Sequence, residues 1–335
     1  MSWQPTTSQN MRQSRATMNR EIRDFFYQRK VLEVETPALS SAGNTDPFIQ
    51  SFSLKSPSQS AQSVSRFLHT SPEYPMKRLL AAGSGDIYQI CKVWREEESG
   101  RNHNPEFTLL EWYRVGFSAP QLIQEVSDLL HALLPSIQQT DKLYSYEQLF
   151  VEKFGLNPHI SSHDEVLKCV TESIPSLDAY SVSEGSSSCL DKQALLDALL
   201  THCIEPEFDN DCLTVVYDYP ASQSALAKLS QEKSKEDNKP AVAMRFEFYL
   251  GQQELGNGYQ EETSYQRNKD ILQSENAQRH AMGLAPVTQD ENFLNAVKSG
   301  IPESAGVAIG LDRVLMAITG VDSLQKVINF PWDVA

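Results

Sequence analysis

Cysteine is scarce in this sequence of 335 residues, and its arrangement excludes two kinds of stabilising site. The five cysteines are scattered and odd in number, and no two of them form a CxxC pair. This pattern argues against a structural zinc site and against the disulfide framework of a small secreted protein. We therefore expect a protein that works in a reduced, cytoplasmic setting.

Long apolar segments and signatures of nucleotide-binding loops are also missing. No apolar run approaches the roughly 20 residues that a membrane-spanning helix needs. The first residues, MSWQPTTSQNMRQSR, lack the apolar core of a signal peptide. We expect no membrane partner. Because there is no GxxxxGK[ST] string, any phosphate binding has to depend on other residues.

Positive charge is in deficit, with 29 Lys and Arg residues against 44 Asp and Glu residues and a net charge of −15. A nucleic acid is a polyanion, so this balance argues against a general RNA-binding surface while leaving room for a local basic patch. Hydrophobic residues make up 40% of the chain, which supports a sizeable globular core. The length fits one large domain or two small ones.

The segment that best indicates a function is a predicted hairpin. Runs of alternating apolar residues at 86–93 and 106–113 flank a polar connection that contains glycine, which is typical of two antiparallel strands joined by a long loop. Side chains alternate between the faces of a strand, so Phe107, Glu111 and Tyr113 share one face. An aromatic ring, a carboxylate and a phenol in line are unusual for a core.

These residue types suit a surface that binds ATP and an amine. Arg95 can place two donors on a phosphate, and Glu97 can accept from an adenine amino group. Phe107 can stack on the adenine ring, and Glu111 with Tyr113 can hold an ammonium group.

A charged hairpin on a sheet edge explains the same residues without any function. In that interpretation Glu111 is simply paired with Arg114 or Lys92. The local pattern alone does not separate the two interpretations.

Two segments upstream of the hairpin have recognisable elements. Apolar residues at the helical spacing predict an amphipathic helix over 11–29, and VLEVET at 31–36 predicts a strand that Pro37 stops. Further on, an apolar run ends in Ser71-Pro72-Glu73, which suggests a strand that delivers Glu73 to a site. Alternatively Ser71 caps a helix over 72–82 with Glu73 in its first turn, and both can hold at once.

The second half of the chain contains two further candidate sites. Residues 244–250 alternate sharply, and a turn into 254–261 predicts a hairpin that brings Glu247 and Glu254 together. Two carboxylates suit Mg²⁺, although two solvated glutamates at a sheet edge are the simpler explanation. The small-residue strand 304–310 then leads into a helix with Arg313 in its first turn, which is a reasonable anion site.

In order, these segments resemble motifs 1, 2 and 3 of the class II aminoacyl-tRNA synthetases in their lysyl form. Motif 1 falls at about 11–40 with EVETP, motif 2 at about 86–114 with HNPEFT and LEWYR, and motif 3 at about 304–320 with GVAIGLDR. The closest resemblance is to the paralogous family that attaches β-lysine to elongation factor P.

The resemblance implies an α+β fold, the class II synthetase catalytic core, with an antiparallel β-sheet flanked by helices. It implies a single catalytic domain over 1–335 with a helical insertion at about 118–205. Because motif 1 builds the dimer interface in the family, it also implies a homodimer.

The resemblance also implies roles for particular residues. The catalytic residues are Arg95 and Arg313. The residues that bind ATP, which is a substrate, are Arg95, Glu96, Glu97, His103, Asn104, Phe107, Glu254, Leu255, Gly310 and Arg313. The residues that bind the amino acid are Ser71, Pro72, Glu73, Glu111, Tyr113, Asn257, Glu261 and Ala308. The ligands of Mg²⁺ are Glu247 and Glu254.

Three positions depart from the usual lysyl pattern. Ala308 replaces a glycine that lines the amino-acid pocket, and one added methyl group can shift discrimination by roughly 1–3 kcal/mol. The β-lysine family shares this alanine, which is consistent with (R)-β-lysine as the amino acid. Glu96 stands where asparagine is usual, and Trp94 stands where phenylalanine is common.

Because motif 1 begins within the first few dozen residues, we expect no anticodon-binding β-barrel of the kind that precedes motif 1 in lysyl-tRNA synthetases. The resemblance therefore predicts an ATP-dependent enzyme that activates (R)-β-lysine as an adenylate and transfers it to a lysine side chain of elongation factor P, with tRNA an unlikely partner. A stand-alone synthetase that charges RNA is the alternative enzyme. A catalytically inactive binding module is an alternative of another class, although the expected phosphate and metal residues are all present.

Overall fold

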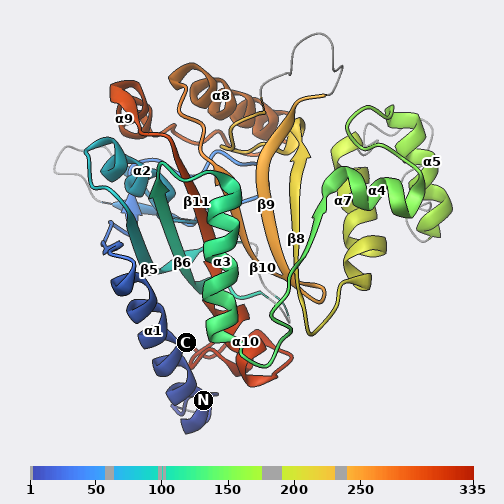
Figure 1. Cartoon of the computed structure of the whole chain (residues 1–335). Coiled ribbons are helices and arrows are strands. Elements are labelled where there is room, and N and C mark those ends of the chain that lie inside the picture. Colours follow the sequence, from blue (N-terminus) through green and yellow to red (C-terminus); the bar gives the residue numbers. More distant parts are fainter. Residues whose placement is uncertain (1–2, 57–63, 97–99, 101–102, 176–190, 231–239) are drawn as a thin grey trace. The chain divides into compact units, whose positions relative to one another are not determined.

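The structure is a computed structural model that describes residues 3–56, 64–96, 100, 103–175, 191–230 and 240–335 (Figure 1). The chain divides into two compact units, one of residues 1–134 with 261–335 and the other of residues 135–260. Each unit is described by itself below. The prediction of a single domain over 1–335 stays a prediction.

The first unit contains a four-stranded arrangement and a small separate sheet. The neighbouring strands are β1 (Leu32–Glu33), β5 (Ile87–Trp94), β6 (Glu106–Val115) and β11 (Ser304–Gly310), in that order. The pairs β5–β6 and β6–β11 are antiparallel, and β1 runs parallel to β5. The small sheet has the order β2 (Leu39–Ser40), β4 (Val64–Leu68) and β3 (Ser53–Ser56).

The helices predicted over 11–29 and 72–82 are found in the first unit within two residues of these bounds, whereas those at Tyr265–Ala281 and Glu291–Gly300 were not predicted. The helical elements of this unit are α1 (Gln9–Gln28), α2 (Glu73–Ala81), α3 (Ala119–Leu133), α8 (Tyr265–Ala281), α9 (Glu291–Gly300), α10 (Leu311–Thr319) and the 3₁₀ turn η5 (Leu324–Lys326). Ser8 caps α1 by accepting a hydrogen bond from the amide of Met11, and Ser118 with Gln121 forms a capping box at the start of α3. The helix predicted over 11–29 is therefore confirmed.

One face of β6 is covered by helices, and this leaves the other face for the predicted site. The Trp112 indole N–H donates to Glu125 of α3 at 3.1 Å, and its ring packs edge-on to Phe26 of α1. Figure 1 shows α3 running in front of β6 and β11. Because side chains alternate along the strand, Glu111 and Tyr113 lie on the opposite face, as predicted.

The second unit packs helices against another group of four strands. The strands are β10 (Gln253–Gln260), β9 (Val242–Leu250), β8 (Leu213–Pro220) and β7 (Lys142–Ser145), in that order. The β9–β10 hairpin and the β8–β9 pair are antiparallel, whereas β7 and β8 are parallel. The helical elements are α4 (Tyr146–Phe154), α5 (His163–Ser173), α7 (Lys192–Leu199), the π-helical η2 (Leu200–Ile204) and the 3₁₀ turns η3 (Glu205–Glu207) and η4 (Ala221–Gln223).

The predicted α+β class is confirmed, with three differences of detail. The strand expected over 31–36 is reduced to Leu32–Glu33. The pairs of β1 with β5 and of β7 with β8 are parallel, so the strand pairing is mixed and not wholly antiparallel. The helices expected at 118–205 include α3, which belongs to the first unit, and are interrupted by β7. Among the described residues no helix is long and apolar enough to cross a membrane.

Candidate active site

The loop of the β5–β6 hairpin brings together two residues predicted to bind ATP. The guanidinium carbon of Arg95 lies 5.1 Å from the centroid of the Phe107 ring, which is a cation–π distance. The Arg95 amide donates to the Pro105 carbonyl at 2.9 Å and closes the base of the loop. The next amide, that of Glu96, donates to the carbonyl of Gln50 at 2.9 Å. Glu97 lies outside the described residues.

Asn104 has its side-chain amide engaged within the protein. Its Nδ2 donates to the carbonyl of Glu106 at 2.6 Å, and its Oδ1 accepts from the amide of Trp332 at 3.0 Å. The side chain is buried. Asn104 therefore fixes the hairpin loop against the C-terminal segment, and its predicted contact with ATP stays a prediction.

Arg313 lies in the first turn of α10, close to the same loop. Its Nη2 is 3.3 Å from Nε2 of His103. The preceding residue, Asp312, is buried and accepts a hydrogen bond from the Thr108 amide at 2.7 Å and an ion pair from Arg15. These contacts fix the start of α10, with Gly310 as its N-cap, against β6. A helix N-terminus with a positioned arginine can bind an anion.

Glu111 is a buried carboxylate with one oxygen engaged. Its Oε1 accepts from the Tyr113 hydroxyl at 2.7 Å, and its Oε2 is buried without a hydrogen-bond partner among the described residues. Burial, and then the charge of Glu73, raise the pKa of Glu111 to about 8. A cationic ligand beside this oxygen would favour the ionised form of Glu111.

The simpler explanation of Glu111 as half of a surface ion pair is wrong. Arg114 instead pairs with Asp86 at 2.9 Å and with Glu125 at 3.4 Å. Lys92 pairs with Glu106 at 3.4 Å. Glu111 faces away from the helix-covered side on which Glu125 lies.

Lys77 joins two other predicted substrate residues, and the sequence analysis missed it. Its ammonium group lies 2.7 Å from Glu73 Oε1 and 2.6 Å from Glu261 Oε2, and its side chain is only 1% exposed. Burial alone would lower the pKa of Lys77, but the two carboxylates raise it above its usual value. Burial raises the pKa of Glu261 to about 7 against the opposing effect of Lys77. The i, i+4 spacing of Glu73 and Lys77 was the available signal.

The segment before α2 positions Glu73 and caps the helix. The Ser71 hydroxyl accepts from the Glu73 amide at 3.0 Å, and Pro72 is the N-cap residue. Glu73 lies in the first turn, where a carboxylate is favourable, and also contacts Lys77. Both interpretations of this segment are therefore compatible with the structure.

Strand β11 lines the same pocket through its small residues. Gly306 pairs with Tyr113, and Ala308 pairs with Glu111 in the antiparallel register. A Cβ atom on Gly306 would overlap the ring of Tyr113 and the carboxylate of Glu261. The absence of a side chain is therefore what lets these two groups approach the strand.

In the second unit, Glu247 is held by three donors. The hydroxyl of Tyr219 donates to its Oε2 at 2.7 Å, Tyr249 donates to the same oxygen at 2.5 Å, and Arg245 pairs with Oε1. Arg245, Glu247 and Tyr249 therefore share a face of β9, as predicted.

The β9–β10 hairpin places the other predicted residues of this unit. Asn257 lies opposite Glu247, and Glu254 lies opposite Tyr249. The Oδ1 atom of Asn257 is buried without a hydrogen-bond partner among the described residues. Leu255 is buried, and its predicted contact with ATP stays a prediction.

Glu205, at the end of the π-helical turn η2, is a third carboxylate near this hairpin that the sequence did not indicate. Burial and the charges of Glu247 and Glu254 raise its pKa to about 7. Mg²⁺ usually takes one or two carboxylates together with phosphate oxygens and water. Both oxygens of Glu247 are engaged by protein donors, so Glu247 has to exchange one of these donors before it can bind the ion. Within the described part of the chain, no three His, Cys, Asp or Glu side chains form a complete metal-binding cluster.

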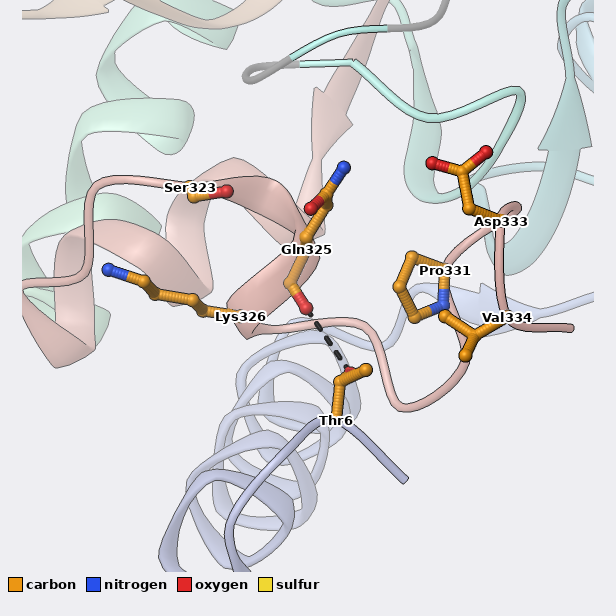
Figure 2. Close-up of a pocket in the computed structure, with 7 residues that line it drawn as sticks. All are labelled: Thr6, Ser323, Gln325, Lys326, Pro331, Asp333 and Val334. Carbon is orange, nitrogen blue, oxygen red and sulfur yellow. Dashed lines mark hydrogen bonds between the residues drawn. The ribbon is translucent and has the colours of Figure 1, made fainter. Parts of the chain in front are cut away.

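A surface pocket in the first unit involves none of the predicted residues (Figure 2). It lies where Thr6 meets the C-terminal segment, and the Thr6 hydroxyl donates to the carbonyl of Gln325 at 3.3 Å. Its other lining residues are Ser323, Lys326, Pro331, Asp333 and Val334. The candidate site consists of the cluster of carboxylates around Lys77 and the arginine-bearing loop, and it shares no residue with the lining of this depression.

Comparison with known proteins identifies the class to which this architecture belongs. A family described as tRNA synthetases class II (D, K and N) matches residues 1–334. The chain therefore belongs to the class II tRNA synthetase family.

Similar proteins are named elongation factor P--(R)-beta-lysine ligase. One from Avibacterium paragallinarum is 42% identical over 331 residues, which is 98% of this chain and 97% of that protein. One from Histophilus somni (strain 2336) is 41% identical over 99% of this chain and 98% of that protein. One from Vibrio parahaemolyticus is 40% identical over 99% of both.

Proposed function

We propose that this chain is an ATP-dependent ligase that activates (R)-β-lysine and transfers it to a lysine side chain of elongation factor P. The observation that carries the proposal is the buried Oε2 atom of Glu111, which has no hydrogen-bond partner among the described residues and lies in a cluster of carboxylates with Glu73 and Glu261. A buried charge needs a partner, so such a pocket suits a substrate with more than one ammonium group. The names of the similar proteins agree with this chemistry.

In the first half-reaction, a carboxylate oxygen of the amino acid attacks the α-phosphorus of ATP, and pyrophosphate leaves. Such a step depends on positioning and on stabilisation of charge more than on covalent help from the protein. Arg95 would hold the α-phosphate, with Phe107 against the adenine ring, and Arg313 would hold the phosphate tail together with His103. Glu96, Glu97, Asn104 and Gly310 are the further residues proposed for ATP.

In the second half-reaction, the side-chain amine of a lysine in elongation factor P attacks the activated carbonyl carbon. AMP leaves, and the amine loses a proton as the amide forms. Tyr113 would keep Glu111 oriented toward the ammonium group of the bound amino acid, because its hydroxyl is the donor to Oε1.

Glu247 and Glu254 would hold Mg²⁺, with the remaining ligands supplied by phosphate oxygens and water. When bound, the ion would neutralise negative charge on the phosphates. The roles proposed for Leu255 in binding ATP and for Asn257 in binding the amino acid rest on the family resemblance. The homodimer and the cytoplasmic setting are proposed on the same basis.

The decisive experiment is the intact mass of elongation factor P after incubation with ATP, Mg²⁺, this protein and (R)-β-lysine. A parallel reaction contains α-lysine. We expect a gain of one lysyl unit, stronger with β-lysine. No gain in either reaction, with a partner factor known to be competent, would reject the ligase. Charging of tRNA with lysine would then favour the stand-alone synthetase, and a lack of pyrophosphate exchange with any amino acid would favour an inactive binding module.

Ala308 is expected to contribute to the preference for β-lysine. Ala308 lies directly opposite Glu111 in the antiparallel register. Removing the Ala308 methyl group therefore enlarges the space beside that carboxylate. We expect Ala308→Gly to raise kcat/KM for α-lysine relative to β-lysine by about 10-fold or more, since one methyl group is worth roughly 1–3 kcal/mol. Pyrophosphate exchange with each amino acid measures this ratio. An unchanged ratio would remove Ala308 from the specificity determinants.

A further inference from the structure

Lys77 is a buried charged residue to which none of the predicted roles applies. It lies on α2, one helical turn after Glu73, and bridges that carboxylate to the carboxylate of Glu261. Its ammonium group also lies 5.9 Å from the ring centroid of Phe293. A lysine is rarely fully buried unless it is paired, and here its partners are two residues proposed to bind substrate.

The ionised side chains of this site carry a net negative charge. Glu73, Glu111 and Glu261 contribute three negative charges when ionised, and Lys77 contributes one positive charge. The net charge is then −2, which equals in magnitude the charge of the two ammonium groups of a diamino acid. Without Lys77 the same pocket would carry −3 and would exceed the charge of such a substrate.

We propose that Lys77 is a positioning and specificity-determining residue that sets the net charge of the amino-acid pocket to −2 and so matches it to a diamino acid. This inference rests on the proposed function and extends it to a residue that does not itself contact the reacting atoms. By bridging Glu73 and Glu261, Lys77 orients both carboxylates, and its charge opposes the effect of burial on the pKa of Glu261. It leaves the Oε2 atom of Glu111 open for the substrate.

The alternative is that Lys77 merely ties α2 to the residue after β10. Removing Lys77 takes the cation away from two neighbouring carboxylates in either role, so it changes the proton balance of substrate binding in both. The roles differ in whether a second substitution that restores the net charge also restores binding.

Substrate binding should already release protons in the unaltered protein. The pKa values of Glu111, about 8, and of Glu261, about 7, mean that the empty pocket holds protons at pH 7. Substrate ammonium groups favour the ionised carboxylates, so binding expels these protons and strengthens as pH rises from 6 to 8.

The neighbouring titratable groups do not reverse this balance. Burial raises the pKa values of Tyr74 and Tyr113 well above the usual value, and it raises the pKa of Cys91 to about 12, so all three are neutral at pH 7. Glu275 of α8, whose pKa is raised to about 7 by burial, accepts a hydrogen bond from Thr45. Thr45, the hydrogen-bond partner of Glu275, is therefore not one of the residues that Lys77 bridges.

The test is a double-mutant cycle of Lys77→Met and Glu73→Gln, read by calorimetric titration with (R)-β-lysine in buffers of different ionisation enthalpy at pH 7. Lys77→Met alone leaves three carboxylates and no cation, which is a charge of −3 when all three are ionised. We expect it to weaken binding at least 10-fold and to raise the number of protons released by up to one. Each pKa unit by which a carboxyl must be deprotonated costs a factor of ten.

The effect of Lys77→Met should reverse in the second background. Glu73→Gln alone sets the charge to −1, and adding Lys77→Met restores −2. We therefore expect the double variant to bind (R)-β-lysine more tightly than Glu73→Gln. Weaker binding by the double variant would mean that Lys77 acts as a structural tie, and the proposal would fall. This comparison decides the matter even if Lys77→Met alone does not fold.

A matched control is Lys326→Met, which removes an equally short ion pair. Lys326 lies 2.6 Å from Asp322, but its side chain is 59% exposed. We expect affinity and proton release to be unchanged. Failure of the unaltered protein to bind or transfer any diamino acid would reject the proposed function itself. Normal binding and transfer, together with unaltered affinity and proton release in Lys77→Met, would reject only the inference about Lys77.

Discussion

Replacing Arg95 by alanine is expected to lower the rate of amino-acid-dependent ATP–pyrophosphate exchange by about 10²–10³-fold, the typical effect of removing one preorganised donor to a developing charge. Arg95 lies at the base of the β5–β6 loop, where its amide is tied to Pro105 and its guanidinium group lies over Phe107. Because the loop is held by backbone contacts, truncation of the side chain should leave its path intact and remove mainly the phosphate donors.

Two further variants show which property of Arg95 matters. Arg95→Lys keeps the charge but loses the planar pair of donors, so it should recover only part of the rate. Arg23→Ala, which removes an exposed arginine paired with Glu33 at 3.0 Å, should leave the rate within threefold. If Arg95→Ala retained the full exchange rate and still supported modification of elongation factor P in cells, the enzyme hypothesis would be wrong.

Elements with a strong local period were predictable from the sequence. The helix over 11–29 follows from apolar residues at i, i+4, i+7 and i+8, and the structure buries that stripe. The alternating run at 244–250 gives a strand in which Arg245, Glu247 and Tyr249 lie on one face. Arg245 and Tyr249 both donate hydrogen bonds to the carboxylate of Glu247. In both cases the period of the side chains fixes the face without reference to the rest of the chain.

Contacts between distant segments were not predictable in the same way. The hairpin pattern placed Glu111 on one face of β6, but it could not show that Arg114 pairs with Asp86 and Glu125 and not with Glu111. Similarly, Asn104 is occupied by Trp332, which lies 228 residues away in the sequence. The periodic pattern of apolar residues within a segment does not indicate which distant side chain will contact it.

Lys77 and Glu205 show two different limits. Lys77 has the spacing of an exposed ion pair with Glu73, and only the packing of α2 buries it beside Glu261. Glu205 follows a π-helical turn. A π-helix has more residues per turn than an α-helix, so the side chains that follow it point in a different direction. The sequence of that turn gives no periodic signal for this change.

Gly306→Ala is the second substitution with a large expected effect, and it tests the amino-acid pocket directly. The backbone of Gly306 lies outside the left-handed region, so alanine is allowed by its dihedral angles. The added Cβ would instead overlap the Tyr113 ring and the Glu261 carboxylate. We expect both groups to be displaced, with KM for (R)-β-lysine raised by about 100-fold and the free energy of unfolding lowered by roughly 1–3 kcal/mol, as for other overpacked sites.

Val307→Ala separates loss of stability from loss of binding. Val307 is the next residue on β11, is buried, and pairs with Trp112, on the helix-covered face. Its truncation should destabilise the protein by a similar amount through a cavity, while KM for (R)-β-lysine stays within threefold. Thermal unfolding measures the loss of stability in both variants, and the dependence of pyrophosphate exchange on the concentration of (R)-β-lysine measures KM. If Gly306→Ala bound (R)-β-lysine as tightly as the unaltered protein, the space between Tyr113, Glu261 and β11 would not be the amino-acid site, because a methyl group placed there could not leave a substrate contact unchanged.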